Sequence, residues 1–356
     1  MKVYFYRAEC GDAARVHYRG SDGQYHNIFI DSGYERTYDL VLRQEIEKIR
    51  ERGELIDLWV ISHIHDDHIG GVIAYLQDIH AGRSNDIVDQ WFYNPPRTAA
   101  GKGNSRRHSA TAAFRSIKQG DQLSDYLTGK DRIGHLEITD RHPVRDLFGM
   151  KLYVLTPQRA QLQKLRDKYA PGKQRALEKM EAEPPEAARQ FDYHIPLERF
   201  NLKKWEEDLS VENGSSISVL MDYGGNKILW LSDAFPGSII KGLKKLGYSK
   251  TNPLVCDWVK VTHHGSKGNN STALYSMIRC NNYLISADGL NSHCLPTKEC
   301  LARILCNPAR PPGSKYLIRF TYNNRILRKM FDVDGADVYH RYQFEVSFSS
   351  RKWIRV

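Results

Sequence analysis

Three histidines and two aspartates lie close together between residues 62 and 71, where the sequence reads SHIHDDHIGG. The side chains of His63, His65, Asp67 and His68 are of the types that bind Zn²⁺, Mn²⁺ or Fe²⁺. One ion in an open catalytic site needs fewer protein ligands than this segment offers, and such a cluster beside an apolar strand serves no packing purpose. The spacing therefore predicts a centre that holds two divalent metal ions, Zn²⁺ or Mn²⁺.

The elements around this segment predict how the ligands come together. Residues 55–61 form a compact apolar run of strand length, and residues 69–79 have the pattern of a helix. His63 and His65 are two positions apart, so they project to one side if the strand continues. The turn into the helix carries Asp67 and His68 round to the same pocket. We therefore expect the metal centre at a strand-to-helix junction.

The HxHxDH pattern of residues 63–68 resembles the metallo-β-lactamase superfamily. The resemblance implies an α/β fold, a four-layer αβ/βα sandwich of hydrolases. Three further segments resemble landmarks of that family, namely IFIDSG at residues 28–33, LWLSDA at 229–234 and THHGS at 262–266. By this resemblance Asp31 supports the metal loop without binding metal, and Asp233 bridges both ions.

The THHGS segment resembles the late histidine motif of the family, in which one histidine completes the second metal site. His264 is the favoured ligand because a glycine follows it directly, although the choice between the two histidines stays open. His263 is assigned to the substrate phosphate or to proton transfer, and Ser266 to the substrate. Asp67 is expected to orient the nucleophilic hydroxide.

The family also has a middle metal histidine, which is expected between the first motif and Asp233. His142 is the best placed because a glycine-led strand follows at residues 149–155. His108, His135 and His194 are alternatives to His142. A further alternative is a metal site that lacks the middle histidine, as in some branches of the family.

A narrower resemblance links residues 212–216, 263–266 and 286–296 to the hydrolase domain of competence-type DNA-uptake proteins. That subgroup usually has Gly-His-Pro near the last segment, whereas residues 292–296 read SHCLP. The position of His293 in this segment assigns it to substrate binding. The resemblance covers about residues 3–306 and omits the membrane channel of those proteins.

The pattern along the chain indicates one hydrolase domain over residues 1–310, with a charged helical insert at about 158–210 and basic, aromatic strands at 311–356 packed on the same domain. Strands are predicted at residues 3–6, 25–30, 55–61, 87–93, 217–223, 227–232, 258–262, 283–286, 316–322 and 342–348, and helices at 38–50, 69–79, 274–278 and 298–305.

The chain has 356 residues and a formal net charge of +10, and its positive charge is clustered. Residues 97–120 contain six basic and no acidic residues, and residues 310–356 contain ten basic residues against four acidic ones. This clustering predicts that the protein binds a polyanion, with Arg106 and Arg107 as substrate contacts. The alternative interpretation is a solvated basic face without a ligand.

A mean hydropathy of −0.56 and the lack of a long apolar run argue against a membrane span. The first fifteen residues do not fit a signal peptide, and six scattered cysteines without a CxxC pair are read as reduced thiols. We therefore expect a cytoplasmic protein.

Together these features predict a metal-dependent phosphodiesterase or nuclease acting on nucleic acid, with single-stranded DNA as the expected substrate. One alternative is a hydrolase of small phosphoesters or lactones. Another is a metal-stabilised binding protein without activity, which holds a polyanion or a protein partner through the insert.

Overall fold

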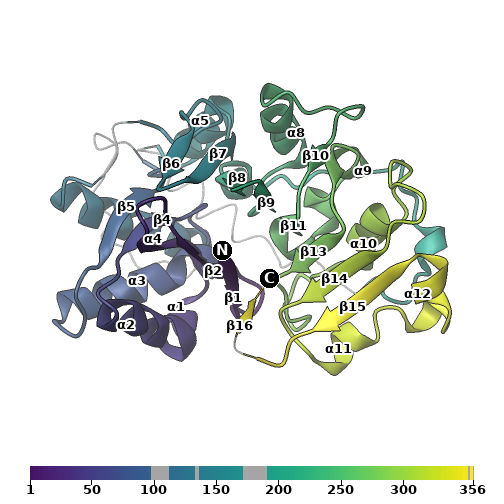
Figure 1. The fold of residues 1–356 in the computed structure, drawn as a ribbon, viewed down its shortest axis with the longest axis horizontal. Helices are drawn as coiled ribbons and strands as arrows, with labels where there is room; N and C mark the ends of the chain where they lie inside the picture. The colour runs from purple at the N-terminus through teal and green to yellow at the C-terminus, as the bar shows by residue number, and fades with distance from the viewer. Residues whose placement is uncertain (98–111, 133–135, 171–190, 352, 356) are drawn as a thin grey trace.

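The structure is a computed structural model of the chain. It describes residues 1–97, 112–132, 136–170, 191–351 and 353–355. Two mixed β-sheets face each other, and helices cover the outer face of each sheet (Figure 1). This arrangement is the αβ/βα sandwich of the metallo-β-lactamase fold, so the predicted fold class is confirmed.

The first sheet has the strand order β16-β1-β2-β3-β4-β5. Its strands pair antiparallel from β16 to β3 and parallel from β3 to β5. The strands are β1 (Lys2–Tyr6), β2 (Ala13–Arg19), β3 (Tyr25–Ser32), β4 (Ile56–Val60), β5 (Val88–Phe92) and β16 (Trp353–Arg355).

The second sheet has the order β15-β14-β13-β11-β9-β8-β7-β6. It is parallel from β15 to β9 and antiparallel from β9 to β6. The strands are β6 (Arg145–Leu147), β7 (Met150–Thr156), β8 (Ser218–Tyr223), β9 (Asn226–Trp230), β11 (Trp258–Lys260), β13 (Asn282–Ile285), β14 (Tyr316–Phe320) and β15 (Phe344–Phe348), and β10 (Leu254–Val255) pairs separately with β12 (Ile278–Arg279).

The helices and helical turns lie between these strands in the chain. They are α1 (Glu35–Thr37), the π-helix η1 (Tyr38–Leu42), α2 (Arg43–Glu51), α3 (Asp66–His80), α4 (Ala112–Gly129), α5 (Arg159–Lys168), η3 (Leu197–Arg199), α7 (Val211–Gly214), α8 (Pro236–Lys245), η4 (Thr262–Gly265), η5 (Lys267–Asn269), α9 (Thr272–Tyr275), α10 (Lys298–Leu305), α11 (Arg325–Arg328), η6 (Asp332–Asp334) and α12 (Val338–Arg341).

Strand β4 illustrates why these residues form a layered fold. Its side chains alternate between two cores, with Leu58 and Val60 in the core between the sheets and Trp59 in the core under the helices. A strand that is buried on both faces is mostly apolar, which explains why Asp57 is the only polar residue in the run at residues 55–61. Between the sheets, the rings of Phe5 and Trp230 stack with centroids 4.7 Å apart and so join the two layers.

Most predicted strands agree with the structure to within two or three residues, and the helix predicted at 298–305 coincides with α10. The prediction of a helix at residues 274–278 is wrong in part, because α9 ends at Tyr275 and Ile278 begins the short strand β12.

Parts of the predicted insert contribute to the cores. Leu162 and Leu165 of α5 pack in the core under the first sheet, and Leu197 packs in the core of the second sheet. Residues 171–190, in the middle of the insert, lie outside the described residues. In the last part of the chain, β14 and β15 extend the second sheet, while β16 joins the first.

Among the described helices, none combines the length and the apolar character needed to cross a membrane.

Candidate metal centre

The HxHxDH segment leaves the first sheet at the end of β4 and enters α3, which begins at Asp66. Close packing of α3 on the end of β3 fixes this junction. A Cβ atom at Gly71 would lie 2.3 Å from the carbonyl oxygen of Ser32, so only glycine allows the helix to approach so closely. The junction therefore holds the ligand-bearing turn rigidly between two buried elements.

Asp31, at the end of β3, organises this turn. It is fully buried and has a positive φ of 54°. Its Oδ1 accepts a hydrogen bond from the Ser62 backbone N–H at 2.7 Å, and its Oδ2 contacts His68 Nδ1 at 2.9 Å. A carboxylate on one ring nitrogen of a histidine fixes the ring and leaves the other nitrogen free to bind metal. Asp31 thus presents Nε2 of His68 to the cluster described next.

Four side chains bring one ligand-type atom each to a common point, which we name the first cluster: Asp67 Oδ2, His68 Nε2, Asp233 Oδ2 and His264 Nε2. His264 Nε2 lies 3.3 Å from both Asp67 Oδ2 and His68 Nε2, and Asp233 Oδ2 lies 3.4 Å from His68 Nε2 and 3.6 Å from His264 Nε2. Ligands about 2.0 Å from one tetrahedral Zn²⁺ lie about 3.3 Å from one another. The spacing in the first cluster therefore suits a shared divalent ion.

A second cluster shares Asp233 with the first. His63 Nε2 lies 3.1 Å from His65 Nδ1 and 3.8 Å from Asp233 Oδ2. Since the same oxygen of Asp233 faces both clusters, this carboxylate is in the position of a bridge between two ions. The buried His/Asp clusters are thus consistent with a dinuclear metal site.

The electrostatics of the clusters also fit bound cations. Burial opposes the charged form of Asp233, but His68 and the other surrounding imidazoles outweigh it and lower the pKa of this carboxyl. Burial, aided by His68, lowers the pKa of His63, which keeps that imidazole neutral as a metal ligand requires. Asp233 Oδ1 is buried without a hydrogen-bond partner among the described residues. A buried carboxylate oxygen is costly when unpaired, and a metal ion would satisfy it.

The THHGS turn directs its two histidines to different partners. His263, His264 and Gly265 all have positive φ, and two successive non-glycine residues in this region store backbone strain of the kind found at functional sites. His264 is buried in the first cluster. His263 instead contacts Asn269 Oδ1 through Nδ1 at 2.7 Å, and its Nε2 lies 3.7 Å from Asp233 Oδ2.

Other predicted site residues lie apart from the clusters. His142 contacts the Pro143 carbonyl and the ring of Phe92, and His293 is exposed; neither belongs to a potential metal-ligand group among the described residues. Ser266 follows the histidine turn, and its backbone N–H donates to the His263 carbonyl at 2.7 Å. Arg106, Arg107, His108 and His135 lie outside the described residues, while His194 is exposed.

Sequence reasoning missed two groups around the late histidines. Asp208 Oδ2 accepts from Asn213 Nδ2 at 2.6 Å and from Asn269 Nδ2 at 3.1 Å, and lies 3.5 Å from His263 Nδ1. Burial alone would lower the pKa of His263, but Asp233 and Asp208 outweigh it and raise the pKa. The only sequence signal for this group of polar side chains around His263 was the pair of asparagines at residues 269 and 270, shortly after the histidines.

The second missed group is an ion pair behind His264. Lys260, the last residue of β11, contacts the carboxylate of Asp12, and both side chains are fully buried. Asp12 Oδ1 lies 3.5 Å from His264 Nδ1. No local pattern joins residues so far apart in the sequence.

A family model matches part of the chain, and several solved structures are similar to it. Residues 23–145 match the model of the metallo-beta-lactamase superfamily. Among solved structures, the chain is similar to a CmlA β-hydroxylase mutant (12% identity, 85% of this chain and 49% of that chain covered, TM-score 0.37). It is also similar to the long form of RNase Z from yeast (12% identity, 80% and 37% covered, TM-score 0.35) and to the metallo-β-lactamase MIM-1 from Novosphingobium pentaromativorans (14% identity, 85% and 86% covered, TM-score 0.31).

The chain therefore spans about half of the CmlA chain and less of the RNase Z chain. No curated protein sequence matches it, and none of the comparisons singles out the competence-type DNA-uptake proteins. The family match covers the segment that carries the HxHxDH turn, and the remaining ligands reach the same point from the second sheet. Residues 23–145 thus match the metallo-β-lactamase superfamily, and the two-sheet architecture and the buried His/Asp centre suit a metal-dependent hydrolase of that fold.

Proposed function

We propose that the protein is a metal-dependent phosphodiesterase that cleaves nucleic acid, with single-stranded DNA as its preferred substrate. The observation that carries this proposal is a basic side chain beside the metal loop. Arg115 of α4 contacts Asp66, the neighbour of Asp67, with Nη1 and Oδ2 3.3 Å apart. Its side chain is 63% exposed, so the guanidinium is also accessible to a phosphate group.

Helix α4 supplies a second cation on the same side. Lys118 lies one helical turn after Arg115 and is exposed, whereas Ile117 and Gln119 between and beside them are buried. Gln119 Nε2 donates to Asp66 Oδ1 at 2.5 Å and so anchors the helix to the metal loop. The basic face of α4, Arg115 and Lys118, therefore suits the backbone of a substrate that extends from the metal centre.

The C-terminal segment gives less support than its composition suggested. Tyr316 and Phe320 are buried in the core of the second sheet and are not available to stack on bases. Arg310 donates to the carbonyls of Leu305 and Tyr342, so it holds loops together. The proposal therefore depends on α4 and on the overall charge of +10.

The chain's own residues would share the reaction as follows. His63, His65 and Asp233 would hold one ion, and the four residues of the first cluster the other. When bound, two divalent ions supply an activated water and neutralise charge on the phosphoryl oxygens. Within this arrangement, Asp67 orients the nucleophile, because its side chain is 20% exposed and reaches the open side of the centre.

We assign His263 to the leaving group, and its contacts support this assignment. Asn269 Oδ1 accepts the Nδ1 proton, which fixes the ring with Nε2 toward Asp233 and the metal centre. A proton on Nε2 can then be transferred to the departing oxygen of the sugar. Asp208 holds this arrangement in place through its contacts with Asn269 and the imidazole.

The direct test is cleavage of labelled single-stranded and double-stranded DNA and RNA by purified protein with Mn²⁺ or Zn²⁺. An Asp67→Ala variant is the inactive control, and His142→Ala is the matched control for a histidine outside both clusters. Metal-dependent cleavage that is lost only in Asp67→Ala supports the proposal.

Failure to cut any nucleic acid while metal is bound would overturn it. In that case, turnover of a simple aryl phosphodiester or a lactone would identify a small-molecule hydrolase. Bound metal without any hydrolysis would identify a binding protein.

A further inference from the structure

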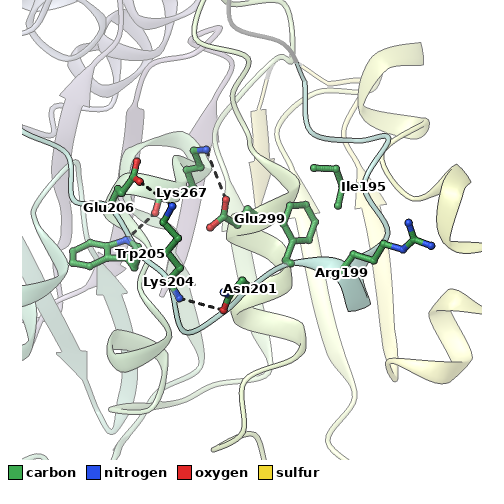
Figure 2. A pocket seen from close by; sticks show the side chains of 9 residues that line it. Ile195, Arg199, Asn201, Lys204, Trp205, Glu206, Lys267 and Glu299 are labelled. Atoms are coloured by element: carbon green, nitrogen blue, oxygen red, sulfur yellow. Dashed lines mark hydrogen bonds and ion pairs between the residues drawn. The ribbon is translucent and has the colours of Figure 1, made fainter.

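A cavity of about 240 Å³ lies on the surface beside the histidine turn, and we name it the side pocket. One wall is the segment that runs from η3 toward α7, and the other comes from η5 and α10 (Figure 2). It is lined by Ile195, Arg199, Phe200, Asn201, Lys204, Trp205, Glu206, Lys267 and Glu299.

The side pocket shares a wall with the metal centre. Trp205 Nε1 donates to the Lys267 carbonyl at 3.0 Å, and Asp208 N donates to the Gly268 carbonyl at 3.1 Å. The next residue of that loop, Asn269, contacts His263 at 2.7 Å. A single short loop, residues 267–269, therefore separates the side pocket from the histidine placed near the leaving group.

The side chains of the side pocket combine aromatic surface with cations. The indole N–H of Trp205 is held by a backbone carbonyl, which fixes the ring, and both Trp205 and Phe200 keep part of their surface accessible. A fixed, partly exposed aromatic ring is the usual platform for an unpaired base. The volume lies below the 300–1,000 Å³ or so of drug-sized pockets, which suits a single nucleotide unit better than a longer segment.

The two lysines of the side pocket are only loosely paired. Lys204 Nζ lies 3.7 Å from Glu206 Oε1, and Lys267 Nζ lies 3.8 Å from Glu299 Oε2. Their side chains are 76% and 61% exposed. Exposed pairs of this length contribute little stability, so a phosphate group can recruit both ammonium groups at low cost. Figure 2 shows both lysines between Trp205 and Glu299.

We propose that the side pocket binds one nucleotide of a single-stranded substrate close to the scissile bond, with its base against Trp205 and its phosphate on Lys204 and Lys267. This assignment rests on the proposed nuclease function, and it adds a recognition element formed by the segment after η3 together with η5 and α10. Stacking on aromatic side chains works for every base, so the side pocket would favour unpaired strands without selecting a sequence. A duplex, whose bases are already stacked, would not enter it.

The test measures equilibrium binding of a short fluorescein-labelled oligothymidylate by polarisation, in EDTA, so that no cleavage is required. Loss of one stacked base costs about 1–3 kcal/mol, which corresponds to roughly a 5- to 150-fold loss of affinity for Trp205→Ala. Trp205→Phe is expected to restore most of the affinity. Replacing both pocket lysines with Met should make the salt dependence shallower by about 1.4 in the log–log slope. Lys315→Met is the control, since Lys315 directly precedes β14, lines no part of the side pocket and is paired with Glu345.

Unchanged affinity in Trp205→Ala would overturn the proposal, as would an equal loss in Trp205→Ala and Trp205→Phe, which would indicate a structural role. The two proposals fail separately. If the wild-type protein binds the oligothymidylate through Trp205 but never cuts it, the side-pocket proposal stands and the nuclease proposal is refuted. If the wild-type protein cuts the substrate but the variants bind it with unchanged affinity, the nuclease proposal stands and the side-pocket proposal is refuted. A wild-type protein that neither binds nor cuts would refute both proposals.

Discussion

Replacing Lys260 with Met is expected to destabilise the protein strongly, although the residue lies outside both metal clusters. Lys260 and Asp12 form an ion pair with both side chains fully excluded from solvent. Among the described residues, neither group has a hydrogen bond to a third partner. Removing the ammonium leaves the Asp12 carboxylate buried and uncompensated. Breaking a buried pair in this way costs about 3–5 kcal/mol, so we expect a loss of that size in the free energy of unfolding.

The double variant Asp12→Asn/Lys260→Met separates this explanation from a simple loss of packing. If the cost arises from an unpaired charge, neutralising Asp12 should recover most of it, because buried ion pairs replaced on both sides are often neutral in stability. Chemical denaturation of the metal-free protein in EDTA measures the effect without a contribution from bound ions. Lys315→Met is the matched control, since its partner Glu345 is exposed and the expected change is at most about 1 kcal/mol. A loss below about 1 kcal/mol in Lys260→Met, or no recovery in the double variant, would refute the reasoning.

Three further outcomes follow from the structure. Asp233→Asn should reduce bound metal from two ions per chain to one or none, while the control His142→Ala should keep both ions. Elemental analysis after dialysis measures the metal content, and two ions per chain in Asp233→Asn would refute the bridging role of Asp233. Arg115→Gln should weaken oligonucleotide binding and make its salt dependence shallower by about 0.7 in the log–log slope, and an unchanged slope would show that Arg115 does not touch a phosphate. Burial opposes the charged form of His26, but Asp57 outweighs it and raises the pKa above 6.5. The stability that His26 contributes is therefore complete below pH 6.5 and falls as pH rises through the folded-state pKa. The difference in unfolding free energy between wild type and His26→Asn should shrink as pH rises above 6.5, and a difference that grows with pH would contradict this.

The parts of the fold that sequence patterns predicted are those that local chemistry determines. Strand β4 is apolar except at Asp57 because both of its faces are buried, and α10 begins where Thr297 accepts a hydrogen bond from the Cys300 backbone N–H. Both signals lie within a few residues of the element that they define. The HxHxDH turn is equally local, so its four ligand-type residues could be named from spacing alone.

The remaining part of the candidate site depends on contacts between distant segments. Asp208 lies in the stretch predicted as a charged helical insert, yet it reaches His263 because residues 205–208 run along the loop after the histidine turn. His142 was chosen for its position between two motifs, but order along a chain does not determine where a ring points. Sequence periodicity describes how one element is buried and says little about which other element covers it.

The pairing of β16 with β1 has a consequence for how the protein is made. Tyr4 pairs with Arg355 and Tyr6 with Trp353, so β1 acquires its outer neighbour only after all the other described strands have been made. Until then β1 presents an open row of backbone donors and acceptors at the edge of the first sheet, which invites pairing with other nascent chains. Such long-range closure slows folding, and the second sheet must form in between. We therefore expect newly made chains to depend on chaperones until β16 has docked.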